Sequence, residues 1–354
     1  MAQNGNSSPS IPETMKAWTI EGKTGFDNLK FNPKAPVPEP SDYEVLVKFH
    51  AASLNYRDLI IPKGQYPFPC ATSINPLSDG SGTIIKVGPK VTRFHAGDKV
   101  CTLFNQTHLS TALTPYNLAS GLGGSVNGTL RQYGTFNENG LVPMPSNLSF
   151  NQAATLSCAG VTAWNALYGV ASQQIKPGDW VLTQGTGGVS IFALQFAKAA
   201  GAKVIATTSS AAKAEVLKKL GADHVFNYNE TKNWGEEAKR ISGTGVDFVI
   251  EVGGPTTLGQ SLKAVKIGGI INIIGFVGGS SEGPGFMEIL SNLCTVRGIL
   301  VGSRDLFENM NRAIESSDIK PVVDEKIFSI DSAKEAYEYM WAQKHFGKVV
   351  ISIE

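Results

Sequence analysis

The 354-residue sequence has few cysteines, and none of them lie close together. The four cysteines are Cys70, Cys101, Cys158 and Cys294, and no two of them form a CxxC pair. The sequence therefore predicts neither a disulfide framework nor a structural zinc site. A reducing compartment suits such a chain, so we expect a cytoplasmic location.

Long apolar runs and basic clusters are absent as well. No apolar segment reaches the roughly 18 residues that a membrane helix needs. The formal net charge is +1 and no basic run exceeds two residues, so we expect neither a membrane nor a nucleic-acid partner. Residues 1–14 are polar and lack the apolar core of a signal peptide, which predicts a disordered tail.

Glycine is abundant, and one glycine-rich turn organises the second half of the chain. The apolar run Trp180–Thr183 indicates a strand, and Gly185, Gly187 and Gly188 follow it. Apolar residues then recur at the spacing of a helix. A helix that opens on such a turn presents free N–H groups and a partial positive charge, which suits a pyrophosphate. Ser190 replaces the third glycine of the GxGxxG pattern, so the turn alone also fits a plain strand-to-helix connection.

The residues after this turn repeat the strand-and-helix alternation. Helical patterns separate the second, third and fourth of the strand-like runs, and this alternation predicts a doubly wound parallel sheet of the Rossmann, dinucleotide-binding kind. The runs are Val204–Ala206, His224–Tyr228, Val246–Val252, Gly269–Gly275 and Thr295–Val301.

The first half of the chain has short β-prone runs separated by turn residues, which is typical of a compact antiparallel barrel. The runs are Met15–Ile20, Tyr43–Ala51, Gly82–Val87, Lys99–Leu103 and Gln132–Phe136. Phe104–Asn127 is a long polar loop, and loops of this length usually carry function or move. Helical patterns cover Gln152–Val170, Ser303–Ser316 and Ser332–Gln343, and a last strand is expected over Lys348–Ile353.

Seven motifs in a fixed order make the chain from Met15 to Glu354 resemble the medium-chain dehydrogenase/reductase superfamily. The motifs are Ser53–Asp58, Gly64–Pro67, Pro76–Gly82, Cys158–Trp164, Gly185–Ser190, Leu220–Asp223 and His345–Val350. The resemblance implies a GroES-like antiparallel β-barrel catalytic domain of residues 15–156 and 303–354. It also implies a Rossmann domain of residues 157–302, an active site in the cleft, and a homodimer that pairs through Thr295–Val301.

The sequence departs from the zinc-dependent members of that superfamily at the catalytic metal. Those members bind zinc with Cys, His and Cys at positions that align with Asn55, Ser78 and Cys158 here. Asparagine and serine are poor zinc ligands, and one thiolate cannot hold a metal that prefers four ligands. The chain is therefore similar to the zinc-free branch of quinone and enoyl reductases, and we expect no metal.

The residues after the second Rossmann strand favour NADPH as the cofactor. NAD-specific domains place an acid about 20 residues beyond the glycines, whereas Ala206–Ser210 contains none. The small residues Ser209 and Ser210 leave room for a 2′-phosphate. By resemblance, Lys213 and Tyr228 hold that phosphate, although Lys213 also fits a solvated helix lysine.

The remaining cofactor contacts follow from the resemblance. Each glycine among them could be only a turn, but together they occupy the strand ends where such sheets bind ligands. Beside the glycine turn with Val189 and Ser190, they are Thr162, Val252, Gly253, Gly275, Phe276, Val277, Gly302, Ser303, Arg304, Phe346 and Lys348.

Without zinc, we expect an acceptor that can delocalise the negative charge left on it by hydride addition. A conjugated C=C bond or a quinone does so, and a few hydrogen-bond donors then suffice. The expected donors are Asn55, Tyr56 and Tyr66. By resemblance Tyr66 is the proton donor, although an aromatic packed on the cleft wall fits the sequence equally well.

We expect an NADPH-dependent reductase of a small conjugated molecule or quinone. The alternatives are a zinc-free alcohol dehydrogenase or carbonyl reductase, and a catalytically silent NADPH-binding protein.

Overall fold

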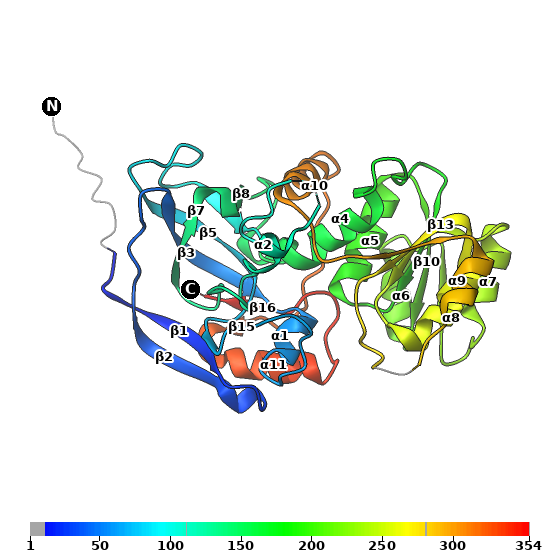
Figure 1. Ribbon diagram of the computed structural model, residues 1–354, viewed down its shortest axis with the longest axis horizontal. Coiled ribbons are helices and arrows are strands. Elements are labelled where there is room, and N and C mark those ends of the chain that lie inside the picture. Colours follow the sequence, from blue (N-terminus) through cyan, green and yellow to red (C-terminus); the bar gives the residue numbers. More distant parts are fainter. Residues whose placement is uncertain (1–10, 111, 280–281, 354) are drawn as a thin grey trace.

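A mostly antiparallel sheet system and a six-stranded parallel sheet lie at opposite ends of the molecule (Figure 1). The computed structural model describes residues 11–110, 112–279 and 282–353. The predicted tail of residues 1–14 lies outside the described residues up to position 10, and Thr14 already belongs to the first strand. No helix in the described ranges combines the length and the apolar character needed to span a membrane.

The antiparallel lobe is built from short strands whose alternate side chains fill one core. Val45, Val47 and Phe49 point into this core from β3, and Phe49 packs edge to face on Phe136 at 5.6 Å. The main sheet has the order β15-β16-β3-β5-β6-β8, with β7 also paired to β3, and a small sheet has the order β2-β1-β4. The strands are β1 (Thr14–Glu21), β2 (Leu29–Pro36), β3 (Glu44–Ser53), β4 (Ser73–Ile74), β5 (Asp79–Val87), β6 (Lys99–Thr102), β7 (Tyr133–Asn137), β8 (Leu141–Pro143), β15 (Phe328–Ser329) and β16 (Val350–Ser352).

The end of the chain returns to this lobe, as Figure 1 shows by the red strand and helix among the blue ones. Strand β16 pairs antiparallel with β3, and Val350 lies opposite Ser53. This pairing places the residues just before β16 beside those just after β3. The helices of the lobe and of its connections are α1 (Tyr56–Ile60), α2 (Pro115–Leu118), α3 (Phe150–Ala153), α10 (Arg304–Ser316) and α11 (Ala333–Trp341).

The second lobe has the parallel order β11-β10-β9-β12-β13-β14. The chain order reverses between β9 and β12, which is the switch point where such sheets bind ligands. The strands are β9 (Trp180–Gln184), β10 (Lys203–Thr208), β11 (His224–Asn227), β12 (Val246–Glu251), β13 (Val265–Ile273) and β14 (Thr295–Gly298).

Helices cover both faces of the parallel sheet, so its strands are buried on both sides. Residues of α4 (Val161–Tyr168), α5 (Gly188–Ala199) and α6 (Ala211–Lys219) share one core. Residues of α7 (Trp234–Ser242), α8 (Pro255–Ala264) and α9 (Phe286–Asn292) share the core of the other face. The predicted fold class is therefore confirmed: a GroES-like β-barrel lobe joined to a Rossmann-like parallel sheet.

The structure differs from the predicted elements at several places, and the predicted long loop Phe104–Asn127 contains the short helix α2. The sixth strand ends at Gly298 instead of Val301, and Val301 adopts a left-handed φ of 51° that cannot continue a strand. The predicted helix over Gln152–Val170 is divided, because a short π-helical segment (Leu156–Gly160) precedes α4. Helix α9 was not predicted. The domain boundaries at residues 156 and 302 remain predictions.

Candidate active site

A cavity of about 1840 Å³ lies between the two lobes. It exceeds the roughly 300–1,000 Å³ of ordinary small-molecule sites, so it has room for a dinucleotide together with a substrate. Most of the residues singled out from the sequence line it: Asn55, Tyr56, Tyr66, Thr162, Gly185, Gly187, Gly188, Val189, Ser190, Ser209, Lys213, Tyr228, Val252, Gly275, Phe276, Val277, Ser303 and Lys348.

The glycine turn presents bare backbone to this cavity. Gly185 has a φ of +72°, and a Cβ on Gly185 or Gly187 would meet no described atom within 4 Å. Ser190 is buried and donates to the backbone oxygen of Gln184 at 2.6 Å, which ties the first turn of α5 to the end of β9. The free N–H groups at the start of this 12-residue helix therefore face open space, as a pyrophosphate requires.

The segment before β16 crosses this turn. Gly347 N donates to Thr186 O at 3.2 Å, and a Cβ on Gly188 would lie 2.6 Å from Cδ of Lys348. Gly188 is therefore needed so that the Lys348 stem can pass over the start of α5. The neighbouring Phe346 is held by its backbone N–H, which donates to Asp324 Oδ2 at 2.9 Å.

The residues expected at a 2′-phosphate gather beside the end of β10. Ser209, Lys213 and the half-exposed Tyr228 line the cavity together, and Lys213 Nζ donates to the backbone oxygen of His345 at 3.1 Å. Ser210 has another role, since its hydroxyl accepts the Lys213 N–H as the N-cap of α6. This end of the cavity thus offers hydroxyl groups, an ammonium and no acid from residues 206–210.

Five of the expected cofactor contacts fall outside the lining. Gly302 packs on Val161, where an added Cβ would come within 2.7 Å of Val161 Cγ1. Arg304 turns its guanidinium to Asn139 Oδ1 at 3.0 Å, while its neighbour Ser303 lines the cavity and caps α10. The described lining residues do not include Ser210, Gly253, Gly302, Arg304 and Phe346.

Glu251, at the end of β12, is a site residue that the sequence analysis missed. Its fully buried carboxylate accepts the N–H groups of Gly253 and Gly254 at 2.9 Å each and bonds the Thr257 hydroxyl at 2.5 Å. It also accepts the Gln184 amide at 2.8 Å and so connects the ends of β9 and β12. An acid at a strand end is a common pattern, and no sequence signal set this one apart.

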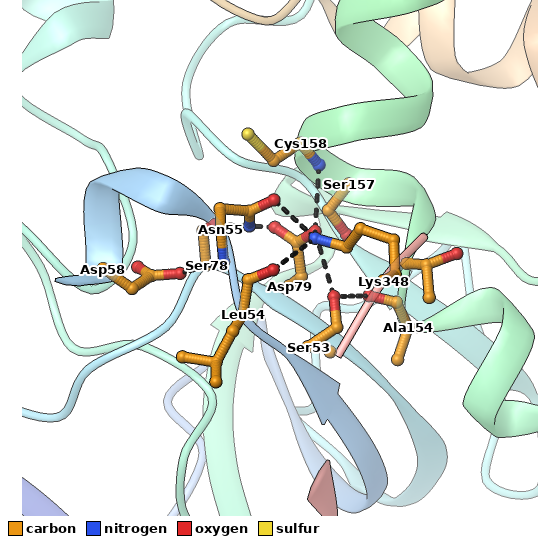
Figure 2. Close-up of polar contacts among 12 residues, drawn as sticks. Ser53, Leu54, Asn55, Asp58, Ser78, Asp79, Ala154, Ser157, Cys158 and Lys348 are labelled. Carbon is orange, nitrogen blue, oxygen red and sulfur yellow. Dashed lines mark hydrogen bonds and ion pairs between the residues drawn. The ribbon is translucent and has the colours of Figure 1, made fainter. Parts of the chain in front are cut away.

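A buried polar cluster forms the floor of the site on the barrel side (Figure 2). Lys348 Nζ donates to Leu54 O at 2.6 Å and to Asn55 Oδ1 at 2.5 Å, and lies 3.6 Å from Asp79 Oδ2. Asp79 is fully buried and accepts the Ser78 hydroxyl at 2.6 Å. Residues just after β3, at the start of β5 and just before β16 therefore meet at one point.

The three positions that align with zinc ligands are occupied by Asn55, Ser78 and Cys158, whose polar groups contact other residues of the chain. The Ser78 hydroxyl and Asn55 Oδ1 already bond Asp79 and Lys348. Burial raises the pKa of Cys158 to about 12, which keeps its sulfur a neutral thiol, whereas zinc binds the thiolate. In the described ranges no group of three or more His, Cys, Asp and Glu side chains could hold a metal.

Tyr66 and Tyr56 stand on the wall above this floor. Burial raises the pKa of Tyr66, and the nearby Arg57 guanidinium, 5.1 Å from the ring centre, opposes that rise. Tyr56 meets Phe276 of the other lobe edge to face at 6.2 Å, so it spans the cleft. Both side chains line the cavity, and Tyr66 remains protonated at neutral pH.

Arg57 is the second missed residue. Its guanidinium lies between the rings of Tyr66 and Phe104, 4.7 Å from the latter, and donates to Leu122 O at 2.7 Å. The adjacent Asp58 accepts the Asn55 backbone N–H at 2.8 Å, and burial raises the pKa of Asp58 to about 6. An arginine in a five-residue helix gives no sequence signal that separates a buried cation from a solvated one.

Two family models match this chain. Residues 41–146 match the alcohol dehydrogenase GroES-like domain and residues 188–316 match the zinc-binding dehydrogenase model. A zinc-type alcohol dehydrogenase-like protein of Schizosaccharomyces pombe is 48% identical over 94% of this chain and 97% of its own length. A 2-methylene-furan-3-one reductase of Solanum lycopersicum is 31% identical over 98% of this chain and 81% of its own length.

A solved structure agrees with these matches. The crystal structure of a putative alcohol dehydrogenase from Sinorhizobium meliloti superposes with a TM-score of 0.89 at 37% identity. The match covers 97% of this chain and all of that one. The chain therefore belongs to the medium-chain dehydrogenase/reductase superfamily and is an oxidoreductase of that superfamily.

Proposed function

We propose that the protein uses NADPH to reduce a conjugated C=C bond or a quinone, without a catalytic zinc. The observation that carries this proposal is the floor of the site, where Asn55, Ser78 and the neutral Cys158 thiol take the positions of metal ligands. When hydride adds to a plain ketone, the negative charge develops on one oxygen, and a metal would stabilise that charge by several kcal/mol. A conjugated acceptor spreads that charge, so neutral donors suffice.

The lining residues divide this task between cofactor and substrate. NADPH, when bound, supplies the hydride. The glycine turn and the start of α5 would hold its pyrophosphate, and Lys213 with Ser209 would hold its 2′-phosphate. Asn55, Tyr56 and Tyr66 would surround the acceptor, where Tyr66 can give the proton that completes the reduction.

The names of the relatives support two different acceptors. The tomato relative is named a reductase of a methylene-furanone, which favours a conjugated ketone here. The fission-yeast relative is named a zinc-type alcohol dehydrogenase-like protein, so its name favours the alcohol dehydrogenase or carbonyl reductase activity of the second candidate but not the absence of zinc.

Turnover of matched acceptors separates these candidates. NADPH oxidation should be measured with an enone, its saturated ketone and a panel of quinones, and NADP⁺ reduction should be measured with the corresponding allylic alcohol. We expect the enone or a quinone to react far faster than the saturated ketone. Preferential reaction of the ketone or alcohol would identify the second candidate, and tight NADPH binding without any turnover would identify a silent binding protein.

Metal content gives a separate prediction. Purified protein should carry well under one zinc per chain by elemental analysis, and a chelator should leave its activity unchanged, because Asn55 and Ser78 cannot replace Cys and His, respectively, as ligands. The control is the same chelation of a zinc-dependent alcohol dehydrogenase, which must lose activity. Stoichiometric zinc that leaves together with activity would contradict the proposal.

A homodimer is also expected. Strand β14 is at the edge of the parallel sheet, and an unpaired edge invites pairing with another chain. The neighbouring α9 exposes Phe286, Met287 and Leu290, which a second copy would cover. Light scattering at micromolar concentration should give twice the chain mass, and Phe286→Glu with Leu290→Glu should lower it. A monomeric wild type would count against the dimer.

All four cysteines are free in the structure. This fits a reducing compartment, and a cytoplasmic location remains a prediction from the sequence.

A further inference from the structure

The ammonium of Lys348 lies among the residues that replace a metal site. It contacts Asn55 Oδ1 and lies 3.6 Å from Asp79, which adjoins Ser78 in the sequence. Cys158 closes the same cluster, since its backbone N–H reaches Asp79 Oδ2 at 3.3 Å (Figure 2). Lys348 is only 4% exposed, so a positive charge is buried beneath the substrate end of the cavity.

Neutral oxygens are the atoms nearest to this charge. Lys348 Nζ donates to Leu54 O at 2.6 Å and to Asn55 Oδ1, whereas the Asp79 carboxylate lies farther away. That carboxylate is shared with the Ser78 hydroxyl, the Cys158 N–H and the Ser53 hydroxyl at 3.4 Å. The Lys348 charge therefore acts strongly on the Asn55 amide.

This contact fixes the orientation of the Asn55 amide. An ammonium can only donate hydrogen bonds, so the amide atom that faces Lys348 must be the oxygen. The amide nitrogen then faces the other way, and among the described residues Asn55 Nδ2 has no hydrogen-bond partner although it is buried. Asn55 lines the cavity, and a buried donor without a partner calls for an acceptor that the protein does not supply.

We propose that Lys348 takes the place of the metal as the local positive charge, and that it acts through Asn55. Lys348 holds and polarises the Asn55 amide so that Nδ2–H donates to the carbonyl or quinone oxygen of the substrate. Lys348 is thus a positioning residue and Asn55 is the group that touches the substrate. The inference rests on the proposed function for its acceptor class, namely molecules with an oxygen conjugated to the reacting bond.

A chromophoric ligand tests this arrangement without turnover. 4-Dimethylaminocinnamaldehyde absorbs at longer wavelength when its carbonyl oxygen accepts a strong hydrogen bond, and with saturating NADP⁺ no hydride is available to reduce it. We expect a shift to longer wavelength on binding to the full-length wild type. Asn55→Ala should abolish most of the shift and raise the Kd of the probe about tenfold, as expected for a lost hydrogen bond from a polarised donor.

Lys348→Met keeps the long stem that crosses Gly188 but leaves Asp79 buried without a cation, which can prevent folding. The decisive variant is therefore Lys348→Met with Asp79→Asn, which removes both charges together. It should lose the shift and weaken the probe about tenfold, and adding Asn55→Ala should cause no further loss, because both changes remove one interaction. Lys263→Met, on the exposed face of α8, is the matched lysine control and should keep the full shift.

Three results would overturn the inference. They are no spectral shift in the wild type, a full shift in Lys348→Met with Asp79→Asn, or losses of probe affinity that add to about a hundredfold when Asn55→Ala is combined with that variant. Failure of the proposed reaction is a separate result. The shift does not depend on hydride transfer, so the expected spectra without enone or quinone turnover would contradict the proposed function and support the roles of Lys348 and Asn55.

Discussion

Tyr66→Phe is expected to lower kcat at least roughly tenfold while NADPH affinity and the fold stay intact. The proposed reduction leaves an enolate or a quinone oxyanion that must gain a proton, and general acid catalysis contributes about 10²- to 10⁴-fold. Water can replace part of that contribution, so the lower bound is set at tenfold. The variant keeps the ring and with it the contacts to Arg57 and to Phe68, which lies 5.4 Å away.

The ionisation of Tyr66 gives this prediction a pH signature. Because burial raises the pKa of Tyr66 above its ordinary value near 10, the phenol stays protonated from pH 6 to 9. Its capacity to donate is therefore constant over that range. The wild-type rate should therefore not fall between pH 6 and 9 through ionisation of Tyr66. Any pH dependence in that range should also be present in Tyr66→Phe.

The measurement is single-turnover NADPH oxidation with the best acceptor, so that hydride transfer and protonation are observed directly. Tyr43→Phe, at an exposed position on the barrel lobe, is the matched control and should react like the wild type. An unchanged rate in Tyr66→Phe would make Tyr66 a wall residue. A slow Tyr56→Phe in the same experiment would move the proton to Tyr56.

The parallel sheet was predictable because its signals are local. Buried strands appear as short apolar runs, and Gly185, Gly187 and Gly188 mark the first turn within a few residues of Trp180. Lys213 follows the same logic, since it lies one turn into the helix after β10. The position of the glycine turn and of Lys213 at the cavity therefore follows from spacing along the chain, whereas their cofactor contacts stay predictions.

The floor of the site depends on contacts between residues that are far apart in the sequence, and the spacing of motifs does not reveal such contacts. Lys348 and Asn55 are separated by 293 positions, and only the pairing of β16 with β3 brings them together. A cofactor contact of Lys348 stays a prediction from its motif, and in the structure its ammonium contacts Leu54 O and Asn55 Oδ1 of the barrel lobe. A motif locates the backbone position of a residue, but packing determines where the terminal group of a long flexible side chain lies.

Arg304 shows the same limit at a helix start. The sequence located the helix, and Ser303 is its N-cap. Nothing in the pattern indicated that the Arg304 guanidinium would bond Asn139, 165 positions earlier, instead of facing the cavity. Side-chain direction at a helix start depends on which neighbour offers an acceptor, and here that neighbour is far away in the sequence.

Lys213→Ala is expected to weaken NADPH binding about 10- to 150-fold and to leave NADH binding nearly unchanged. A hydrogen bond from a charged group contributes about 1.5–3 kcal/mol, which converts to that range. In the structure Lys213 Nζ gives one hydrogen bond to His345 O, and an ammonium has three donors, so others remain for a phosphate.

The neighbouring groups make Lys213 the charged partner at this end of the cavity. Burial, and then the charge of Lys213, lower the pKa of His345 below 6.5, so its imidazole is neutral at pH 7. Ser209 and Tyr228 offer only neutral hydroxyl groups. The 2′-phosphate distinguishes the two cofactors, so the loss should fall on NADPH alone.

Fluorescence titration of both reduced cofactors against the same preparation measures this difference. Lys219→Ala, an exposed lysine in the last turn of the same helix, is the control for a general change of charge and should leave both affinities within about twofold. High salt should weaken NADPH binding more in the wild type than in Lys213→Ala, because the variant has lost the screened interaction. Equal losses for NADPH and NADH would remove Lys213 from phosphate recognition and leave it as a lysine that fastens the His345 segment.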